Sequence, residues 1–348
     1  MATDINTDGD TIAAFDRDLA SDCLEGHWRL DALAAEPAAP GRPHLWKWDM
    51  LYAHLMRAGE IHGMEGGASR RTLRLCGPGL AIQATTPTLQ ASIQLVKPGE
   101  IAVAHRHSMA ALRFVLQGTG GFTTVEGEKF IMEPHDLILT PNWSWHDHGN
   151  DTDEPMVWID GLDIPFVQSI HGCFFQSHNT LQQDVTRQDG YHARFAGAMR
   201  PRNVSVPAGG LPYIYKGTEA LETLAGLGEG EHDPHDGITL EYVNPLTGGP
   251  TFPTLACRLH LLQAGEHTSR HRHTSNTIYH VIEGSGVTEV GGDRLAWGPG
   301  DCFTIPVWAW HDHRVAAGGR AVMFTMSDDP IYKPFALYRS EDAPGNGE

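Results

Sequence analysis

The stretch that decides the fold is Pro98–Gly118, PGEIAVAHRHSMAALRFVLQG. It is rich in residues that favour β-strands, and it places His105 and His107 two positions apart. Side chains at positions i and i+2 of a strand lie on one face, so we expect both imidazoles to point into the same interior. A third histidine, His146, follows in TPNWSWHDHG. The pattern predicts that the three imidazoles bind one catalytic metal ion.

The same pattern returns in the second half of the chain. AGEHTSRHRHTSNTIYHVIEGSG aligns with the first block, and GDCFTIPVWAWHDH aligns with HDLILTPNWSWHDH. His271 stands 166 residues after His105, and His311 stands 165 residues after His146. An offset this constant indicates a duplicated β-domain. The second copy also keeps its own H-x-H pair, His271 and His273.

Outside these blocks, the texture of the sequence predicts the remaining organisation. Short runs rich in Val, Ile, Leu and Thr recur between Gly, Pro and Asp turns, which is typical of sandwiches or barrels of short strands. The N-terminal segments TIAAFDRDLASDCLEGHW and HLWKWDMLYAHLMRAGEIHG, the latter at 44–63, instead have helical spacing. We predict an all-β protein in four parts: a helical arm at 1–66, a first β-domain at 67–168, an interdomain connector at 169–250 and a second β-domain at 251–340.

Composition excludes several classes of partner. The 348 residues include 43 acidic and 25 basic side chains, for a net charge of −18, which disfavours nucleic acid and anionic membranes. No apolar stretch approaches the roughly 20 residues of a membrane span. Five cysteines without a CxxC pair favour free thiols, and MATDINTDGD is no signal peptide. We therefore expect a cytoplasmic protein with neither a nucleic-acid nor a membrane partner.

Both histidine blocks resemble the two motifs of the cupin superfamily, G-x5-H-x-H and G-D-x4-P-x4-H. The chain thus resembles a bicupin, with two jelly-roll (double-stranded β-helix) barrels. Cupins commonly add a glutamate four or five residues after the second histidine, where this chain has Leu112 and Arg113. Three neutral imidazoles leave a divalent ion with its full charge and three open positions, which suits a dianionic bidentate ligand plus O2. Such a site favours Fe(II), with Mn, Co, Ni and Zn as alternatives.

The segments HRHSMAALRF, PNWSWHDHG and WIDGLDIP narrow the resemblance to the gentisate 1,2-dioxygenase family, over roughly residues 40 to 335. The resemblance implies an enzyme of aromatic catabolism with one Fe(II) per N-terminal cupin. Such an enzyme cleaves gentisate with O2 to maleylpyruvate, between the carboxyl-bearing carbon and the adjacent hydroxyl-bearing carbon. Family relatives act on salicylate or 1-hydroxy-2-naphthoate, which are the nearest alternatives. The family also implies a homotetramer. More distant alternatives are another metal-dependent bicupin enzyme, such as an oxalate decarboxylase, and a non-catalytic bicupin.

Arginines are the expected partners of the substrate carboxylate. Arg113 lies an even number of residues after His107, so we expect it to face the same interior. A guanidinium inside a barrel needs a partner, and its fork matches a carboxylate. The resemblance adds a second arginine, which is Arg70 or Arg71, with Arg70 preferred.

Four further positions are assigned by the resemblance. Gln94 matches a glutamine that contacts substrate, and Gln90 stands where relatives that accept salicylate tend to have an aromatic residue. His148 is a candidate proton relay, a ligand contact or a group behind the metal ligands. Asp160 is expected to accept from the hydroxyl para to the first one in gentisate, or to orient a pocket arginine. Gln90 and Ser92, where a glycine is frequent, leave the ring size of the substrate and its need for a second hydroxyl open.

The second copy keeps a candidate metal set, His271, His273 and His311, but its surroundings differ. The replacements, second copy for first, are Tyr279 for Arg113, Thr325 for Asp160 and His260 for Gln94. A site without the arginine is unsuited to an aromatic carboxylate. We therefore predict that the first copy is catalytic and that the second is either structural or a second metal site.

Overall fold

The computed structural model describes residues 9–29, 34–64, 71–187, 190–192 and 210–344, in two compact units that divide after Ala38. The smaller unit contains α1 (Gly9–Ser21) and a turn of 3-10 helix, η1 (His27–Arg29). Helix α1 ends before Cys23, whose φ of 58° lies in the left-handed region. The Asp16 carboxylate accepts from Arg29 Nε at 2.7 Å, which ties η1 to the helix.

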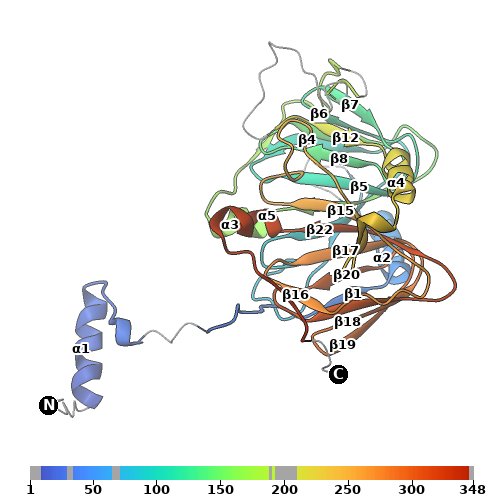
Figure 1. Cartoon of the computed structure of the whole chain (residues 1–348). Coiled ribbons are helices and arrows are strands. Elements are labelled where there is room, and N and C mark those ends of the chain that lie inside the picture. The colour runs from blue at the N-terminus through green and yellow to red at the C-terminus, as the bar shows by residue number, and fades with distance from the viewer. Residues whose placement is uncertain (1–8, 30–33, 65–70, 188–189, 193–209, 345–348) are drawn as a thin grey trace. The chain divides into compact units, whose positions relative to one another are not determined.

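The larger unit begins with a strand and a helix and then builds a first pair of sheets, all of whose strand pairings are antiparallel (Figure 1). The larger sheet has the order β12 (Tyr213–Tyr215), β8 (Leu137–Thr140), β5 (Ala111–Gln117), β10 (Met156–Leu162), β3 (Gln90–Val96), β2 (Thr72–Arg74). The smaller has the order β11 (Phe175–Ser177), β4 (Ile101–His107), β9 (His146–Gly149), β6 (Phe122–Val125), β7 (Glu128–Ile131). Apolar side chains of both sheets share one core, and we call this pair the first barrel.

A second pair of sheets repeats the first. Its larger sheet has the order β1 (His44–Trp46), β20 (Cys302–Ile305), β17 (Thr277–Glu283), β22 (Ala321–Ser327), β15 (Ala256–Leu262), β14 (Gly237–Glu241), β13 (His232–Asp233). Its smaller sheet has the order β19 (Asp293–Trp297), β18 (Gly286–Val290), β21 (His311–Val315), β16 (His271–His273), β23 (Ser340–Asp342). These sheets enclose their own core and form the second barrel. The all-β prediction is confirmed, because strand for strand the two orders correspond.

Each barrel borrows an edge strand that precedes the other barrel in the sequence. Strand β1 comes before the first barrel but pairs with β20 of the second, whereas β12 comes before the second barrel but pairs with β8 of the first. The helices that follow, α2 (Trp48–Ile61) and α4 (Gly217–Gly226), pack on β3 and on β15 respectively. The exchange links the two barrels through main-chain hydrogen bonds.

Two equivalent aspartates fix the starts of these helices. Asp301 accepts from Lys47 Nζ at 2.7 Å and from the Trp48 amide at 2.8 Å. Asp136 accepts from Lys216 Nζ and, at 2.9 Å, from the Gly217 amide. Each carboxylate thus satisfies an amide that the helix itself leaves without a partner.

The exchange corrects two expectations from the sequence. The helix expected over 44–63 is shorter, because residues 44–46 extend along the free edge of β20 before α2 begins. The segment expected to be an interdomain connector at 169–250 contributes β11, β12, β13 and β14 to the sheets, besides α4 and the 3-10 helix η3 (Glu229–Glu231). Both cases concern pairing between segments distant in sequence, which local patterns do not encode.

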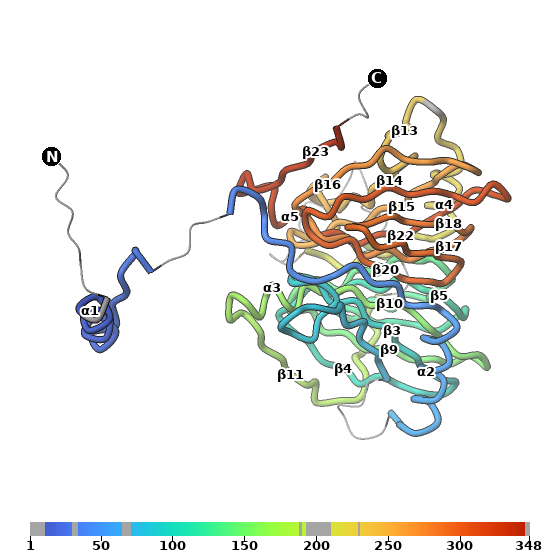
Figure 2. Tube along the Cα trace, turned by 90° about the horizontal axis from the view of Figure 1, so that it is seen from below, coloured from blue at the N-terminus to red at the C-terminus, as the bar shows by residue number. Residues whose placement is uncertain are grey.

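The two large sheets pack against each other through an apolar layer between the barrels (Figure 2). Side chains of β5 alternate, so that Leu112 and Phe114 enter this layer while Val115 enters the core of the first barrel. Phe114 stacks on Phe324 with ring centroids 4.0 Å apart. Burial of such a side chain contributes about 1.5–3 kcal/mol. The alternation also directs Arg113, between Leu112 and Phe114, into the first barrel.

Short helical segments follow the last strand of each barrel: α3 (Ile164–Ser169) after β10, and α5 (Asp329–Tyr332) with the 3-10 helix η4 (Lys333–Phe335) after β22. Among the residues that the structure describes, no helix has the length and apolar character needed to cross a membrane.

Candidate active site

Three histidines converge inside the first barrel. His105 and His107 project from β4, and His146 begins β9, where it lies directly opposite His105 in the ladder. The ring centroids are 4.2 Å apart for His105 and His146, 4.8 Å for His107 and His146, and 5.6 Å for His105 and His107. Nitrogen atoms of the three rings lie within 4.8 Å of one another. This spacing suits a single metal ion.

Hydrogen bonds to backbone carbonyls orient each imidazole. The Nδ1 atom lies 2.8 Å from the Val103 oxygen in His105, 2.9 Å from the Met109 oxygen in His107, and 2.9 Å from the Ser144 oxygen in His146. A carbonyl only accepts, so Nδ1 carries the proton and the Nε2 lone pair remains available. All three rings are therefore in the tautomer that binds a metal through Nε2, and the residues present fit such an ion.

The backbone around the triad departs from regular geometry. The register of β4 against β9 shifts between Ala102 and His105, and such irregularities often re-aim side chains beside active sites. Trp143 has a φ of 61°, and its amide donates to the His107 oxygen at 2.8 Å. The Arg106 guanidinium lies 4.3 Å and 4.4 Å from the ring centroids of Trp143 and Trp145. These contacts fix the turn before His146 against the strand that carries the other two ligands.

The opposite wall carries the predicted substrate residues. Asp160 on β10 lies in register with Arg113 on β5 and with Ser92 on β3. Arg113 is 2% exposed, its Nε lies 3.4 Å from Asp160 Oδ1, and its Nη1 donates to Thr140 Oγ1 at 2.6 Å. Burial lowers the pKa of Arg113, and the Asp160 carboxylate opposes that change. Trp158 Nε1 donates to Asp160 Oδ1 at 3.0 Å, which fixes the carboxylate.

His148 lies between the triad and this wall. Its ring centroid is 5.8 Å from that of His146 and 5.5 Å from that of Trp158. Its Nδ1 lies 2.7 Å from Thr123 Oγ1, and the side chain is fully buried. The ring is therefore part of the barrel interior and not of the surface.

The two predicted glutamines have different environments. Gln94 Oε1 accepts from Thr72 Oγ1 at 3.3 Å, but its Nε2 is buried and has no hydrogen-bond partner within the described part of the chain. An unsatisfied buried donor costs about 1–3 kcal/mol, so this amide is suited to a ligand acceptor. The Gln90 amide instead donates to Thr85 Oγ1 at 3.1 Å and to the Ala91 oxygen at 2.6 Å. Gln90 is thus already engaged by the protein.

Arg71 does not behave as a pocket arginine. Its guanidinium donates to both Glu100 carboxylate oxygens at 2.7 Å, and to the His62 oxygen. Thr72, the next residue, contacts Gln94, so Arg71 points to the other face of the sheet. The expectation that Arg71 could contact substrate is corrected on this ground. Arg70, the preferred alternative, lies outside the described residues.

The second barrel brings together a matching triad. The centroid of His311 lies 4.1 Å from that of His271 and 5.1 Å from that of His273. Burial lowers the pKa of all three imidazoles, that of His273 to about 4, so the rings are neutral near pH 7. His260 Nε2 lies 3.0 Å from Thr325 Oγ1, in the place that Gln94 and Asp160 occupy in the first barrel.

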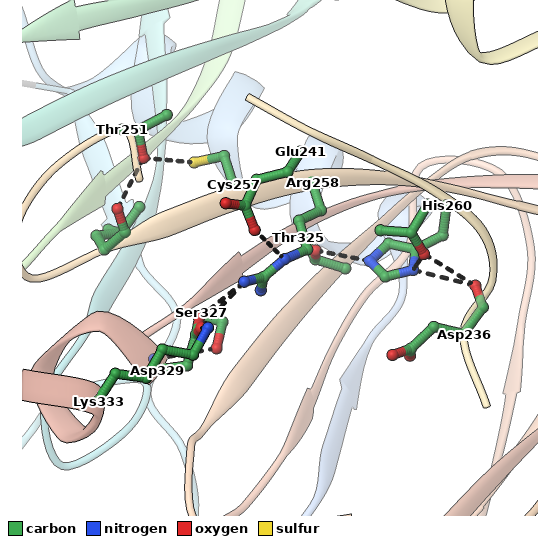
Figure 3. Close-up of polar contacts among 12 residues, drawn as sticks. Asp236, Glu241, Thr251, Cys257, Arg258, His260, Thr325, Ser327, Asp329 and Lys333 are labelled. Atoms are coloured by element: carbon green, nitrogen blue, oxygen red, sulfur yellow. Dashed lines mark hydrogen bonds and ion pairs between the residues drawn. The ribbon is translucent and has the colours of Figure 1, made fainter. Parts of the chain in front are cut away.

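Two residues of the second barrel escaped the sequence reasoning. Arg258 stands 166 residues after Ser92, and its guanidinium binds Glu241 at 2.8 Å and Asp329 at 3.0 Å (Figure 3). Burial would lower the pKa of Arg258, but these carboxylates raise it. Burial likewise would raise the pKa of Asp236, but the surrounding imidazoles, those of His260 and His271 foremost, hold it below the ordinary value. No motif marks Asp236.

A further pair of equivalent aspartates joins each site to the other barrel. Asp163 accepts from the Ala110 amide at 3.0 Å and from Thr254 Oγ1 at 2.6 Å. Asp328 accepts from the Asn276 amide at 2.7 Å and from Thr88 Oγ1. Both amides belong to loops that follow a histidine strand. The signal was present in the repeat of WIDGLDIP as FTMSDDP.

Comparisons with known proteins agree with this geometry. Residues 92–164 and 258–327 each match the family model of the cupin domain, so the bicupin prediction is confirmed. A 5-aminosalicylate 1,2-dioxygenase of Comamonas sp is 38% identical, over 96% of this chain and 91% of the relative. A gentisate 1,2-dioxygenase of Aquipseudomonas alcaligenes is 36% identical, over 91% and 93%. The crystal structure of salicylate 1,2-dioxygenase from Pseudoaminobacter salicylatoxidans with gentisate superposes with a TM-score of 0.86 at 32% identity, covering 100% of this chain and 98% of that chain.

Proposed function

Because the chain belongs to the gentisate 1,2-dioxygenase family of ring-cleaving bicupin dioxygenases, we propose that it cleaves gentisate with O2 to maleylpyruvate. The reaction takes place in the first barrel. The scissile bond joins the carbon that bears the carboxylate to the adjacent carbon that bears the hydroxyl.

The observation that carries this proposal is the buried Arg113–Asp160 pair on the wall opposite the triad. Arg113 uses Nη1 for Thr140, which leaves further N–H groups for a substrate carboxylate. Asp160 holds one N–H of Trp158 and retains capacity as an acceptor, so it can receive a donor on the far side of the ring. The Gln94 amide adds a donor on the same wall.

His105, His107 and His146 would hold Fe(II), one per first barrel. When bound, Fe(II) supplies one-electron chemistry toward O2 and chelation of the substrate carboxylate and ortho-hydroxyl. The neutral triad leaves the 2+ charge uncompensated by protein ligands, which favours a dianionic substrate. His148, buried beside His146, is placed to hold or pass a proton during ring opening.

A second candidate is 5-aminosalicylate, the substrate in the name of the Comamonas relative. Its amino group, like the second hydroxyl of gentisate, donates a hydrogen bond from the position that would face Asp160. Salicylate and 1-hydroxy-2-naphthoate have no donor there, so Asp160 favours the two substituted salicylates. Their aromatic rings and carboxylates would use Arg113 in the same way.

A substrate panel tests the proposal. The protein is reconstituted with Fe(II) without oxygen, mixed with each of the four acids, and then exposed to O2. We expect O2 uptake with matching growth of the near-ultraviolet absorbance of a ring-opened keto acid, fastest with gentisate or 5-aminosalicylate. Equal or faster turnover of salicylate would overturn the role of Asp160. Absence of turnover with every ortho-hydroxy acid would refute the proposed function.

A further inference from the structure

The second triad has the same preparation for a metal as the first. His273 Nδ1 lies 2.9 Å from the Ser275 oxygen, and His311 Nδ1 lies 2.9 Å from the Ala309 oxygen. The nitrogen atoms of His271, His273 and His311 lie within 4.8 Å of one another. Neutral rings with Nδ1 engaged present Nε2 to a common point.

A cavity of about 260 Å³ opens onto this triad. His273 lines it together with His260, Tyr279, Arg258 and Asp236. The volume is at the small end for organic ligands, which usually need about 300 Å³ or more. The lining is polar, and only a metal ion with water or another small ligand matches its size and chemistry.

The charge of the cavity differs from that of the first barrel. Arg258 is bound by Glu241 and Asp329, and Lys333 also contacts Asp329 (Figure 3). The cations are therefore paired with protein carboxylates and cannot serve as a clamp for a substrate carboxylate.

Asp236 provides the opposite charge. Its backbone oxygen lies 3.2 Å from His260 Nδ1, and its carboxylate extends away from that ring (Figure 3). Within the described residues no hydrogen bond or ion pair engages that carboxylate. A carboxylate without a cation, in a cavity shared with a triad of imidazoles, is the set of donors that divalent transition metals bind.

We propose that the second barrel holds a divalent metal at His271, His273 and His311, with part of its charge balanced by Asp236, and that this centre takes water and not an aromatic carboxylate. The centre stabilises the second barrel and is separate from the ring-cleaving site. It does not depend on the substrate proposed above.

Metal content of the intact chain tests this proposal. The protein is loaded with Fe(II), or with Mn(II) as a redox-stable probe, then desalted and measured by mass spectrometry of the metal. We expect two ions per chain in the wild type and one in either His107→Ala or His273→Ala. We expect none in the double variant. One ion in the wild type, lost in His107→Ala and unchanged in His273→Ala, would overturn the proposal.

The role of Asp236 is tested by affinity. Asp236→Asn should weaken binding of one of the two ions by about 10–100-fold in a chelator competition, the scale seen when groups that support a metal are lost. The matched control is Asp293→Asn, an exposed carboxylate on β19 of the same barrel. Equal affinities in the two variants would remove Asp236 from the centre. Thermal melting with and without metal shows whether each variant is folded, and wild-type stoichiometry needs no variant.

Discussion

The two barrels share a frame but differ in the wall that faces the metal ligands. In the first, the row across three strands is Ser92, Asp160, Arg113; in the second it is Arg258, Thr325, Tyr279. The arginine has moved from one side of the row to the other and has acquired two carboxylate partners. The metal-binding geometry is kept in both, and the charge opposite it decides which barrel can accept an anionic substrate.

The largest expected difference between the barrels is in the effect of losing a ligand. His146→Ala should lower turnover by at least about 1,000-fold, because a catalytic metal contributes several kcal/mol and 1.36 kcal/mol corresponds to tenfold. His311→Ala, the equivalent change in the second barrel, should leave kcat within a few-fold. Oxygen uptake at saturating gentisate measures both. A larger loss in His311→Ala would place the reaction in the wrong barrel.

The next effect is that of the carboxylate clamp. Arg113→Ala should lower kcat/KM by about 2–5 kcal/mol, or roughly 30- to 5,000-fold, because it leaves charged partners without their counterpart. Metal content should stay at the wild-type value. Tyr279→Phe is the matched change, and we expect almost no change in kcat/KM. If Arg113→Ala bound gentisate normally, the carboxylate would have to lie elsewhere.

A smaller effect should follow from Asp160→Asn. Asparagine keeps an acceptor for Trp158 but loses the charge, so the preference for gentisate over salicylate should fall by about 5- to 100-fold, which corresponds to 1–3 kcal/mol. The ratio of kcat/KM values for the two acids is the measurement. Thr325→Val in the second barrel serves as the control. An unchanged ratio would show that Asp160 only orients Arg113.

The smallest effect on turnover concerns the contacts between barrels. Burial raises the pKa of Asp328 from 3.8 to about 6. The folded state then binds this proton more tightly than the unfolded state, so the contribution of Asp328 to stability is greatest at low pH. The free energy of unfolding should fall as pH rises from about 4 to 6, and this decrease should be smaller in Asp328→Asn. Urea titrations across that range measure it. Identical pH profiles would exclude Asp328 as the source.

The sequence sufficed for features set by local period and by the repeat. The strand period placed Arg113 on the inner face, and the constant offset identified both triads. Features that depend on long-range pairing were missed, such as the exchange of β1 and β12 between the barrels. Arg71 shows a third limit, because a shift of one residue turns a side chain to the other face of a strand. Arg258 was overlooked since position-by-position comparison of the copies does not follow an arginine that changes strand.

The most direct test of the difference between the barrels is the number of gentisate molecules bound per chain. Isothermal titration of the metal-loaded protein, without oxygen, measures it. We predict one molecule per chain, with binding lost in Arg113→Ala and retained in Tyr279→Phe. Two molecules per chain, or one that persists in Arg113→Ala, would contradict the assignment of substrate to the first barrel.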